Sequence, residues 1–257
     1  MADKHVGRPA GKHADKPAGK HTGSAAISRG HKLPHNTPAA HHAPAAGQAP
    51  AAHHAPAADR TPAAGQAPAE KTVWRGGNML YPLPAVMVSC ARPGEVPNII
   101  TVAWAGTVCS DPAMVSVSVK PSRFSHDIIE ETGEFAVNLV TEDLVRACDW
   151  CGVRSGREVD KFRECGLTPL PAHALTTAPL IAESPLSLEC RVTQILRLGS
   201  HDMFLARVEC VDVDSRRIDE KSRLHLNESG LIVYSHGEYY GLGKKLGTFG
   251  YSVRRKK

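Results

Sequence analysis

Aromatic residues are missing from the first 72 residues of this 257-residue chain, which consist mostly of Ala, Pro, His, Gly and Lys. A segment without large apolar side chains cannot bury enough surface to offset the entropy lost on folding. Frequent prolines also interrupt any helix. We therefore predict a disordered, low-complexity tail at 1–72, with some polyproline II character, followed by a folded domain at 73–257.

The tail repeats PAAHHAPAA at 38–46 and again at 50–58. This repeat has no apolar side to bury, which excludes a solenoid. Its paired histidines have no fixed geometry, so any binding of a transition metal there is interpreted as incidental, and no metal site is predicted.

Long hydrophobic runs are also absent. No stretch approaches the roughly 20 apolar residues that span a bilayer, and the first thirty residues lack the apolar run of a signal peptide. The chain has seven cysteines, an odd number for a set of disulfides. These features predict a cytoplasmic protein with reduced thiols and no association with a membrane.

A basic excess is missing from the folded part. The tail holds nine Lys and Arg against four Asp and Glu, whereas residues 73–257 hold 22 of each sign. The formal net charge of +5 therefore belongs to the tail, where the charges are spread out. A neutral domain is not expected to bind nucleic acid specifically, because it offers no excess charge to the phosphates.

The folded part begins with strand patterns. LPAVMVSC (83–90) and IITVAW (99–104) flank a turn containing Pro and Gly, and they predict a hairpin. AMVSVSVK (113–120) alternates apolar and polar residues, as a half-buried antiparallel strand does. Further strands are predicted at 134–140, 186–199, 201–214 and 231–235.

Three segments have helical spacing, at 122–133, 141–152 and 157–166, and each is closed by a Gly. Ser122 or Ser125 can cap the start of the first. Many short strands with few helices predict a mainly β fold, a small barrel.

Two stretches have unusual chemistry. TVAWAGTVCSDP (101–112) starts as a strand and continues in small residues, which form either a thin piece of core or a backbone surface for a flat ligand. KPSRFSHD (120–127) combines cations, hydroxyls and a helix start. It is either an anion site or an ordinary helix start with solvated cations.

Four pieces, in this order and spacing, resemble the flavin reductase-like family of the flavoredoxin type. They are NIITVAWAGTVCSDP (98–112), VSVSVKPSRFSHDIIEETGEFAVNLV (115–140), CGVRSGREVDKF (151–162) and LECRVTQILRLGSHDMFLARV (188–208). The resemblance covers residues 80–213, and less strongly those up to 253, and leaves the tail without a counterpart. It implies an FMN-binding split β-barrel with a few short helices, and a homodimer.

The resemblance also implies roles for particular residues. The ring and ribityl chain of FMN would lie against Thr101, Trp104, Ala105, Thr107, Cys109 and Ser110. The phosphate would bind Lys120, Ser122, Arg123 and Ser125. A third group near the flavin would be Ser155, Gly156, Asp160 and Lys161. His201 is the one catalytic candidate, because it resembles a histidine near the flavin and nicotinamide, although a lone His at a strand start is usually structural.

The function expected from the resemblance is an FMN-dependent oxidoreductase. One hypothesis is an NAD(P)H-dependent flavin reductase. Another is a flavoredoxin-type carrier that a protein partner reduces, without nicotinamide activity. Pyridoxamine phosphate or haem chemistry, found in related barrels, is a third. No Rossmann fingerprint is present, since GLGKKLG (241–247) lacks the required spacing and helix, so NADH or NADPH would dock only transiently.

CDWC (148–151) has the spacing of a thioredoxin-like motif, but no βαβ pattern surrounds it. Its place near a helix end opposes a thiolate, because the dipole is negative there. The pair is interpreted as two packed thiols, with reversible oxidation as the alternative.

Overall fold

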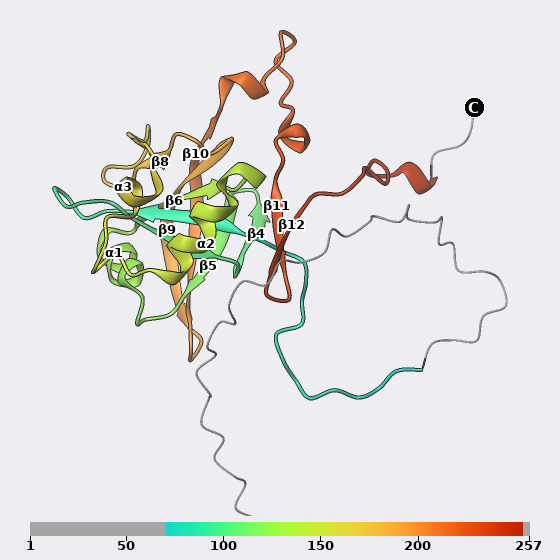
Figure 1. Ribbon diagram of the computed structural model, residues 1–257, viewed down its shortest axis with the longest axis horizontal. Helices are drawn as coiled ribbons and strands as arrows, with labels where there is room; N and C mark the ends of the chain where they lie inside the picture. The colour runs from blue at the N-terminus through green and yellow to red at the C-terminus, as the bar shows by residue number, and fades with distance from the viewer. Residues whose placement is uncertain (1–69, 254–257) are drawn as a thin grey trace, which may run out of the picture. The chain divides into compact units, whose positions relative to one another are not determined.

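A seven-stranded antiparallel sheet organises residues 70–253, the part of the chain that the computed structural model describes. The predicted tail and its histidines lie outside these residues, apart from 70–72. The strand order is β3-β2-β6-β9-β10-β5-β4 (Figure 1). The bounds are Val86–Cys90 for β2, Asn98–Val102 for β3, Ala105–Ser110 for β4, Ala113–Val119 for β5, Glu134–Leu139 for β6, Leu186–Arg197 for β9 and Asp202–Val213 for β10.

The sheet must curl, because its two edges are joined by very little chain. Strands β3 and β4 form opposite edges, yet only Ala103 and Trp104 separate them. Three residue steps reach at most about 11 Å, so the edges lie close together. The Trp104 carbonyl accepts a 2.8 Å hydrogen bond from the Ser118 N–H of β5 at this place. The result is a half-barrel that is open along one line, which confirms the predicted mainly β split-barrel fold.

The concave side of the sheet holds the main core. On β5, Val115, Val117 and Val119 are buried while the residues between them are not, as the alternating pattern predicts. The predicted hairpin is also confirmed, with Val86 opposite Val102 in antiparallel register. Phe135 and Phe204, both fully buried, fill the space between these strands and α1.

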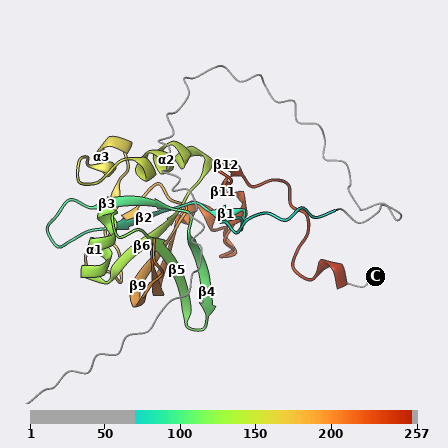
Figure 2. The ribbon, with the colours of Figure 1, turned by 90° about the horizontal axis from the view of Figure 1, so that it is seen from below.

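Three α-helices cover the sheet: α1 (Phe124–Thr132), α2 (Val145–Val153) and α3 (Lys161–Cys165). Figure 2 shows α2 and α3 on one side of β2 and β3, with the β4–β5 hairpin projecting away from them. A second core cluster fills that side and includes Met87, Cys148, Cys151 and Phe162. Because β2 and β3 are buried on both faces, their sequences are almost continuously apolar.

The helix boundaries differ from the predictions in three places. Helix α1 has Arg123 at its N-cap without a side-chain cap bond, so neither Ser122 nor Ser125 caps it. Helix α2 continues past Gly152, and α3 begins only at Lys161. Gly166, with φ 63°, does end α3, because a left-handed residue closes the last turn.

A smaller sheet, in the order β1-β11-β12, packs beside the half-barrel. Its bounds are Leu83–Pro84, Ile232–Ser235 and Glu238–Gly241, and the pair β7 (Pro169–Leu170) and β8 (Leu180–Ile181) completes the strands. Strand β12 was not predicted. Single 3₁₀ turns occur at Glu142–Leu144, Ser215–Arg217, Leu226–Glu228 and Tyr251–Val253. Among residues 70–253, no helix is both long and apolar enough to cross a bilayer.

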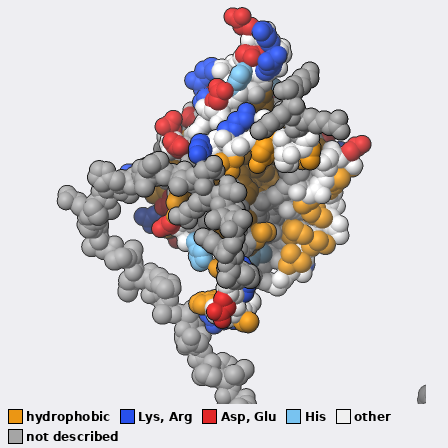
Figure 3. All heavy atoms as spheres, turned by 90° about the vertical axis from the view of Figure 1, so that its right-hand side faces the viewer, with side chains coloured by type: hydrophobic (Ala, Val, Ile, Leu, Met, Phe, Trp, Pro, Cys, Tyr) orange, Lys and Arg blue, Asp and Glu red, His pale blue; other side chains and the backbone are white. Residues whose placement is uncertain are grey.

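Hydrophobic side chains are exposed in two segments that flank the folded part, and Figure 3 shows exposed hydrophobic groups on the face that it views. Trp74 and Leu80 lie in the first segment, and Leu246 and Phe249 in the second. Phe249 makes so little contact that its side chain is fully exposed.

Candidate functional site

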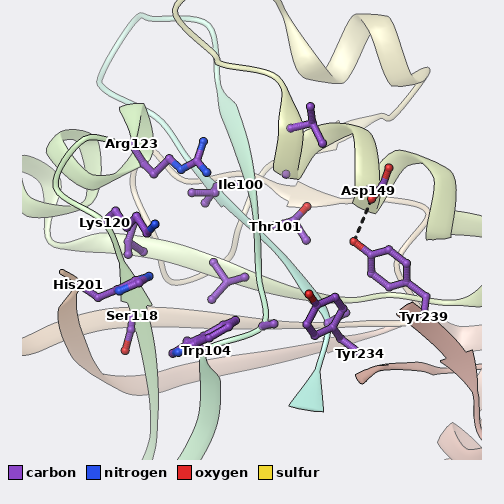
Figure 4. A pocket seen from close by; sticks show the side chains of 16 residues that line it. Ile100, Thr101, Trp104, Ser118, Lys120, Arg123, Asp149, His201, Tyr234 and Tyr239 are labelled. Carbon is purple, nitrogen blue, oxygen red and sulfur yellow. Dashed lines mark hydrogen bonds between the residues drawn. The ribbon is translucent and has the colours of Figure 1, made fainter. Parts of the chain in front are cut away.

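Two adjoining cavities lie where the sheet is open, between β3 and α2 on one side and the β5–α1 connection on the other. The first cavity, with Ser125 and Lys161 in its wall, has a volume of about 210 Å³ and is called the basic pocket. The second, with Trp104 and His201 in its wall, has a volume of about 280 Å³ and is called the main cleft. Both are lined by Ile100, Arg123 and Gly152, so a ligand can extend from one into the other. Figure 4 shows the main cleft from close by.

The basic pocket brings together six of the predicted residues, from three separate parts of the chain. They are Ser122, Arg123, Ser125, Ser155, Gly156 and Lys161. Asn98 and Arg154 also line it and were not predicted. Arg154 directly follows α2, and nothing in its sequence context distinguishes it from an ordinary solvated cation.

Lys161 is the most unusual side chain of the pocket, because it is buried to 3% exposure. Its Nζ donates hydrogen bonds to the carbonyls of Ile99 (2.6 Å) and Cys151 (2.7 Å). Burial lowers the pKa of Lys161 below its ordinary value. Within residues 70–253 no acidic side chain pairs with it, and a buried cation without a counter-ion is costly. The pocket therefore favours an anion.

Asn98 and Gly156 show how closely the pocket is built. The Asn98 Nδ2 donates to the Ser125 Oγ at 2.7 Å, and its buried Oδ1 has no partner among the described residues. A Cβ on Gly156 would lie 2.1 Å from that Oδ1, so only glycine fits there.

A mononucleotide phosphate fits this donor set. Arg123, Arg154 and Lys161 supply three positive charges for a group of nearly two negative charges. The hydroxyls of Ser122, Ser125 and Ser155 add donors.

The main cleft has a basic side and a phenolic side. Lys120 and Arg123 lie on the first side with His201, as Figure 4 shows. On the second, the Tyr239 hydroxyl donates to the Asp149 Oδ1 at 3.3 Å. Burial raises the pKa of Tyr239, so its phenol stays protonated at neutral pH.

Flat groups form part of the cleft wall. Trp104, 40% exposed, is parallel to the His201 ring, with 6.1 Å between ring centroids and 5° between planes. Burial, with the charges of Lys120 and Arg123, lowers the pKa of His201, which is therefore neutral near pH 7. Thr101 lines the cleft, and its hydroxyl donates to the Cys148 carbonyl of α2, so toward a ligand it can only accept.

The structure does not bring every predicted residue to these cavities. Ala105 lines a third cavity, of about 430 Å³, on the other side of Trp104. Thr107, Cys109 and Ser110 lie farther along β4, outside the three cavities, because β4 is a separate strand paired with β5. Asp160 caps α3 by accepting the Arg163 N–H.

The chain supplies other cleft residues that sequence reasoning missed. Asp149, Tyr234 and Tyr239 come from α2 and from strands β11 and β12. Only the folded chain places the β11–β12 hairpin beside β3, so no local pattern distinguishes these tyrosines from exposed ones.

The CDWC pair does not form a thioredoxin-like motif. Cys148 and Cys151 are both buried in α2, and burial raises the pKa of Cys148 to about 11 and that of Cys151 to about 12. The Sγ of Cys151 contacts the Sγ of Cys165 in α3 at 3.8 Å. The interpretation as packed thiols is confirmed, with a different nearest partner.

Among residues 70–253, one cluster has metal-ligand side chains close enough to hold an ion: His173, Glu189 and Asp212. It belongs to another part of the fold, where Glu189 accepts the backbone N–H groups of His173, Ala174 and Leu175. None of these residues lines the basic pocket or the main cleft.

The curled, open antiparallel sheet agrees with the comparisons with known proteins. The sequence model of the family described as "Flavin reductase like domain" matches residues 78–243, more than half of the chain. The protein belongs to this family, which confirms the resemblance seen in the sequence.

Individual relatives are distant. An uncharacterised protein of Aeropyrum pernix is 32% identical over 134 residues, which are 52% of this chain and only 50% of that protein. The NADH-dependent FMN reductase AsuE2 of Streptomyces nodosus subsp. asukaensis is 30% identical over 141 residues, 54% of this chain and 73% of the relative. Among solved structures, flavoredoxin of Desulfovibrio vulgaris (Miyazaki F) is 27% identical with a TM-score of 0.66, covering 72% of this chain and 100% of that one.

Proposed function

We propose that this protein binds FMN, with the phosphate in the basic pocket and the isoalloxazine ring in the main cleft. The observation that carries the proposal is the buried Lys161, which has two backbone acceptors and no acidic partner within residues 70–253. A phosphate beside it, held also by Arg123 and Arg154, supplies the missing counter-charge. Bound FMN supplies hydride and electron transfer, which no protein side chain provides.

The chain's own residues have defined tasks in this proposal. Because Gly156 has no side chain, Asn98 and Phe124 can pack against it at the wall of the pocket. The hydroxyls of Ser122, Ser125 and Ser155 are donors for the phosphate. Trp104 and Ile100 offer apolar surface to the ring. Neutral His201 stands at the rim of the cleft, where a nicotinamide that docks on the ring would pass. It remains a candidate for contacting that nicotinamide.

We propose the activity of an NAD(P)H-dependent flavin reductase, supported by the NADH-dependent FMN reductase among the relatives. The similarity to flavoredoxin favours a second candidate, a carrier reduced by a protein partner. Purified protein loaded with FMN and mixed with NADH or NADPH in a stopped-flow instrument separates the two. Bleaching of the visible flavin band is expected for the reductase. No bleaching over minutes would exclude the reductase and favour the carrier that a protein partner reduces.

The absorbance spectrum of the purified protein tests the cofactor itself. A flavin spectrum is expected, and a haem spectrum or a pyridoxamine phosphate spectrum would contradict the proposal. Titration of the cofactor-free protein with FMN then gives the affinity directly.

We also propose a homodimer, supported by the exposed Trp74, Leu80, Leu246 and Phe249. A second copy that covers these side chains would remove a large apolar surface from water. Light scattering after size-exclusion chromatography is expected to give twice the mass of the chain, and a monomer would contradict this. The free state of all seven cysteines supports work in a reducing, cytoplasmic compartment.

A further inference from the structure

The two cations of the KPSR segment (120–123) occupy different places. Arg123 lines both the basic pocket and the main cleft. Lys120 lines the main cleft alone, where Figure 4 shows it between Arg123 and His201. The division follows from the fold, because Lys120 directly follows the last residue of β5 whereas Arg123 stands at the N-cap of α1.

The electrostatic environment agrees with this separation. The charges of Lys120 and Arg123 both lower the pKa of His201 in the main cleft. Arg123 also acts on Lys161 in the basic pocket, where its charge helps to lower the pKa of Lys161.

Lys120 is also free to meet an anion. It is exposed, and within residues 70–253 no acidic side chain forms an ion pair with it. The acidic residue of the cleft, Asp149, lies on the opposite side and accepts the Tyr239 hydroxyl. His201 is neutral near pH 7 and adds no competing positive charge. The basic pocket already has three cations for a phosphate, so Lys120 is not needed there.

We propose that Lys120 binds the polar edge of the flavin ring rather than the phosphate, and that it binds the reduced ring more strongly than the oxidised one. The proposal rests on the proposed function. A hydride brings two electrons and one proton to a neutral ring and leaves it with one negative charge. A fixed ammonium beside that ring stabilises the reduced form and so raises the reduction potential.

The test compares two variants, Lys120→Met and Arg123→Met, with two ligands. Methionine keeps an unbranched side chain and removes the charge. Riboflavin lacks the phosphate of FMN, so the pair of ligands separates contacts to the ring from contacts to the phosphate. Arg123→Met is expected to weaken FMN at least tenfold and riboflavin little. Lys120→Met is expected to weaken oxidised FMN and oxidised riboflavin by the same small factor, below about threefold.

The second measurement is the midpoint potential of the bound FMN. Lys120→Met is expected to weaken the reduced flavin about tenfold more than the oxidised one, which makes the potential about 30 mV more negative. Lys120→Arg, which keeps the charge, should restore the potential.

Three results overturn the inference. Loss of affinity for FMN with unchanged affinity for riboflavin in Lys120→Met would make Lys120 a phosphate ligand. An unchanged potential would remove Lys120 from the ring, and so would a potential that Lys120→Arg fails to restore. If the unaltered protein binds neither FMN nor riboflavin, the proposed function itself fails, and that outcome is distinct from the other three.

Discussion

Buried charged side chains occur on two sides of this domain, and they differ in whether the chain itself supplies their partners. On one side, Glu134 and Glu189 are buried carboxylates of the neighbouring strands β6 and β9. They accept five backbone N–H groups of the loop at 173–177, and Arg191 pairs with Glu134. On the other side, Lys161 is buried beside Arg123 and Arg154, and none of the three has an acidic partner among residues 70–253.

The difference teaches how structural and functional charges can be told apart. A buried charge whose partners all come from the chain fixes a loop and needs nothing else. A buried charge that has only neutral acceptors, next to further cations, is satisfied completely only when a ligand arrives. Substitutions on the two sides should therefore act on different quantities, the stability of the protein and its affinity for FMN.

The largest effect is expected from Glu189→Ala. It removes the charged acceptor of three backbone N–H groups, including that of the buried Leu175, which should lower the free energy of unfolding by about 3–5 kcal/mol. The FMN affinity of the protein that remains folded should not change. Urea denaturation and FMN titration check the two statements, and a loss of affinity at full stability would break the comparison.

Lys161→Met should show the reverse behaviour. Removing a buried cation should leave the free energy of unfolding of the FMN-free protein unchanged or higher. FMN binding should weaken by roughly 1.5–3 kcal/mol, the range for a hydrogen bond to a charged group. Arg163→Met is a matched control, since Arg163 lies on the same helix with its side chain 76% exposed. An equal loss of affinity in the control would contradict a specific role for Lys161.

A steric change in the pocket should have a smaller effect. A Cβ at Gly156 would lie 2.1 Å from the Asn98 Oδ1 and 2.8 Å from the Phe124 Cδ1, so both side chains must move in Gly156→Ala, and FMN affinity should fall by about 1–2 kcal/mol. Gly243→Ala has open space around its Cβ and serves as the control. Isothermal titration of both variants checks this, and unchanged binding in Gly156→Ala would place the phosphate elsewhere.

The two sides should also respond to opposite ends of the pH scale. Burial acts to raise the pKa of Glu134, but the N–H groups of Thr176 and Thr177, with Arg191, outweigh it and hold the pKa below its ordinary value. The resulting stability is present above the unfolded pKa and is lost as the pH falls through the folded one. Lys161 has a lowered pKa, so FMN affinity should fall as the pH rises toward it, earlier than for an exposed lysine.

Denaturation and FMN titration as functions of pH check both statements. Lys161→Met should lose the alkaline decline in FMN affinity while keeping the acid decline in stability. A decline of the same size in the variant would show that another group titrates.

The smallest effect is expected from deletion of residues 1–72. Their composition predicts no contribution to the core, so FMN affinity and the free energy of unfolding should stay the same. Loss of flavin binding in the shortened protein would show that this interpretation of the tail is wrong.

Most of the half-barrel could be predicted from local patterns. The alternation of Val115, Val117 and Val119 identified β5, and Gly133 and Gly166 marked the ends of two helices. The strand β4 was missed, because its small and partly exposed residues have no clear periodicity. Strand β4 is an edge strand that is hydrogen-bonded only to β5, so it forms without a regular alternation of apolar and polar residues.

The candidate site was predictable where residues are close in sequence or carry a family motif. Ser122, Arg123 and Ser125 were found in this way, together with Gly156 and Lys161. The burial of Lys161 could not be foreseen, because it depends on the packing of α3 against β3. Thr107 to Ser110 follow the sheet edge and line none of the three cavities, so their contact with the flavin stays a prediction.

The joining of β3 and β4 through two residues has a mechanical consequence. The strands β3 and β4, which meet at the cleft, are the two edge strands of the same seven-stranded sheet. The two-residue connection limits how far these edges can separate, and Phe135 and Phe204 pack against the strands between them. Substitutions of Phe135 or Phe204 should therefore change ligand affinity, although neither residue lines the cleft.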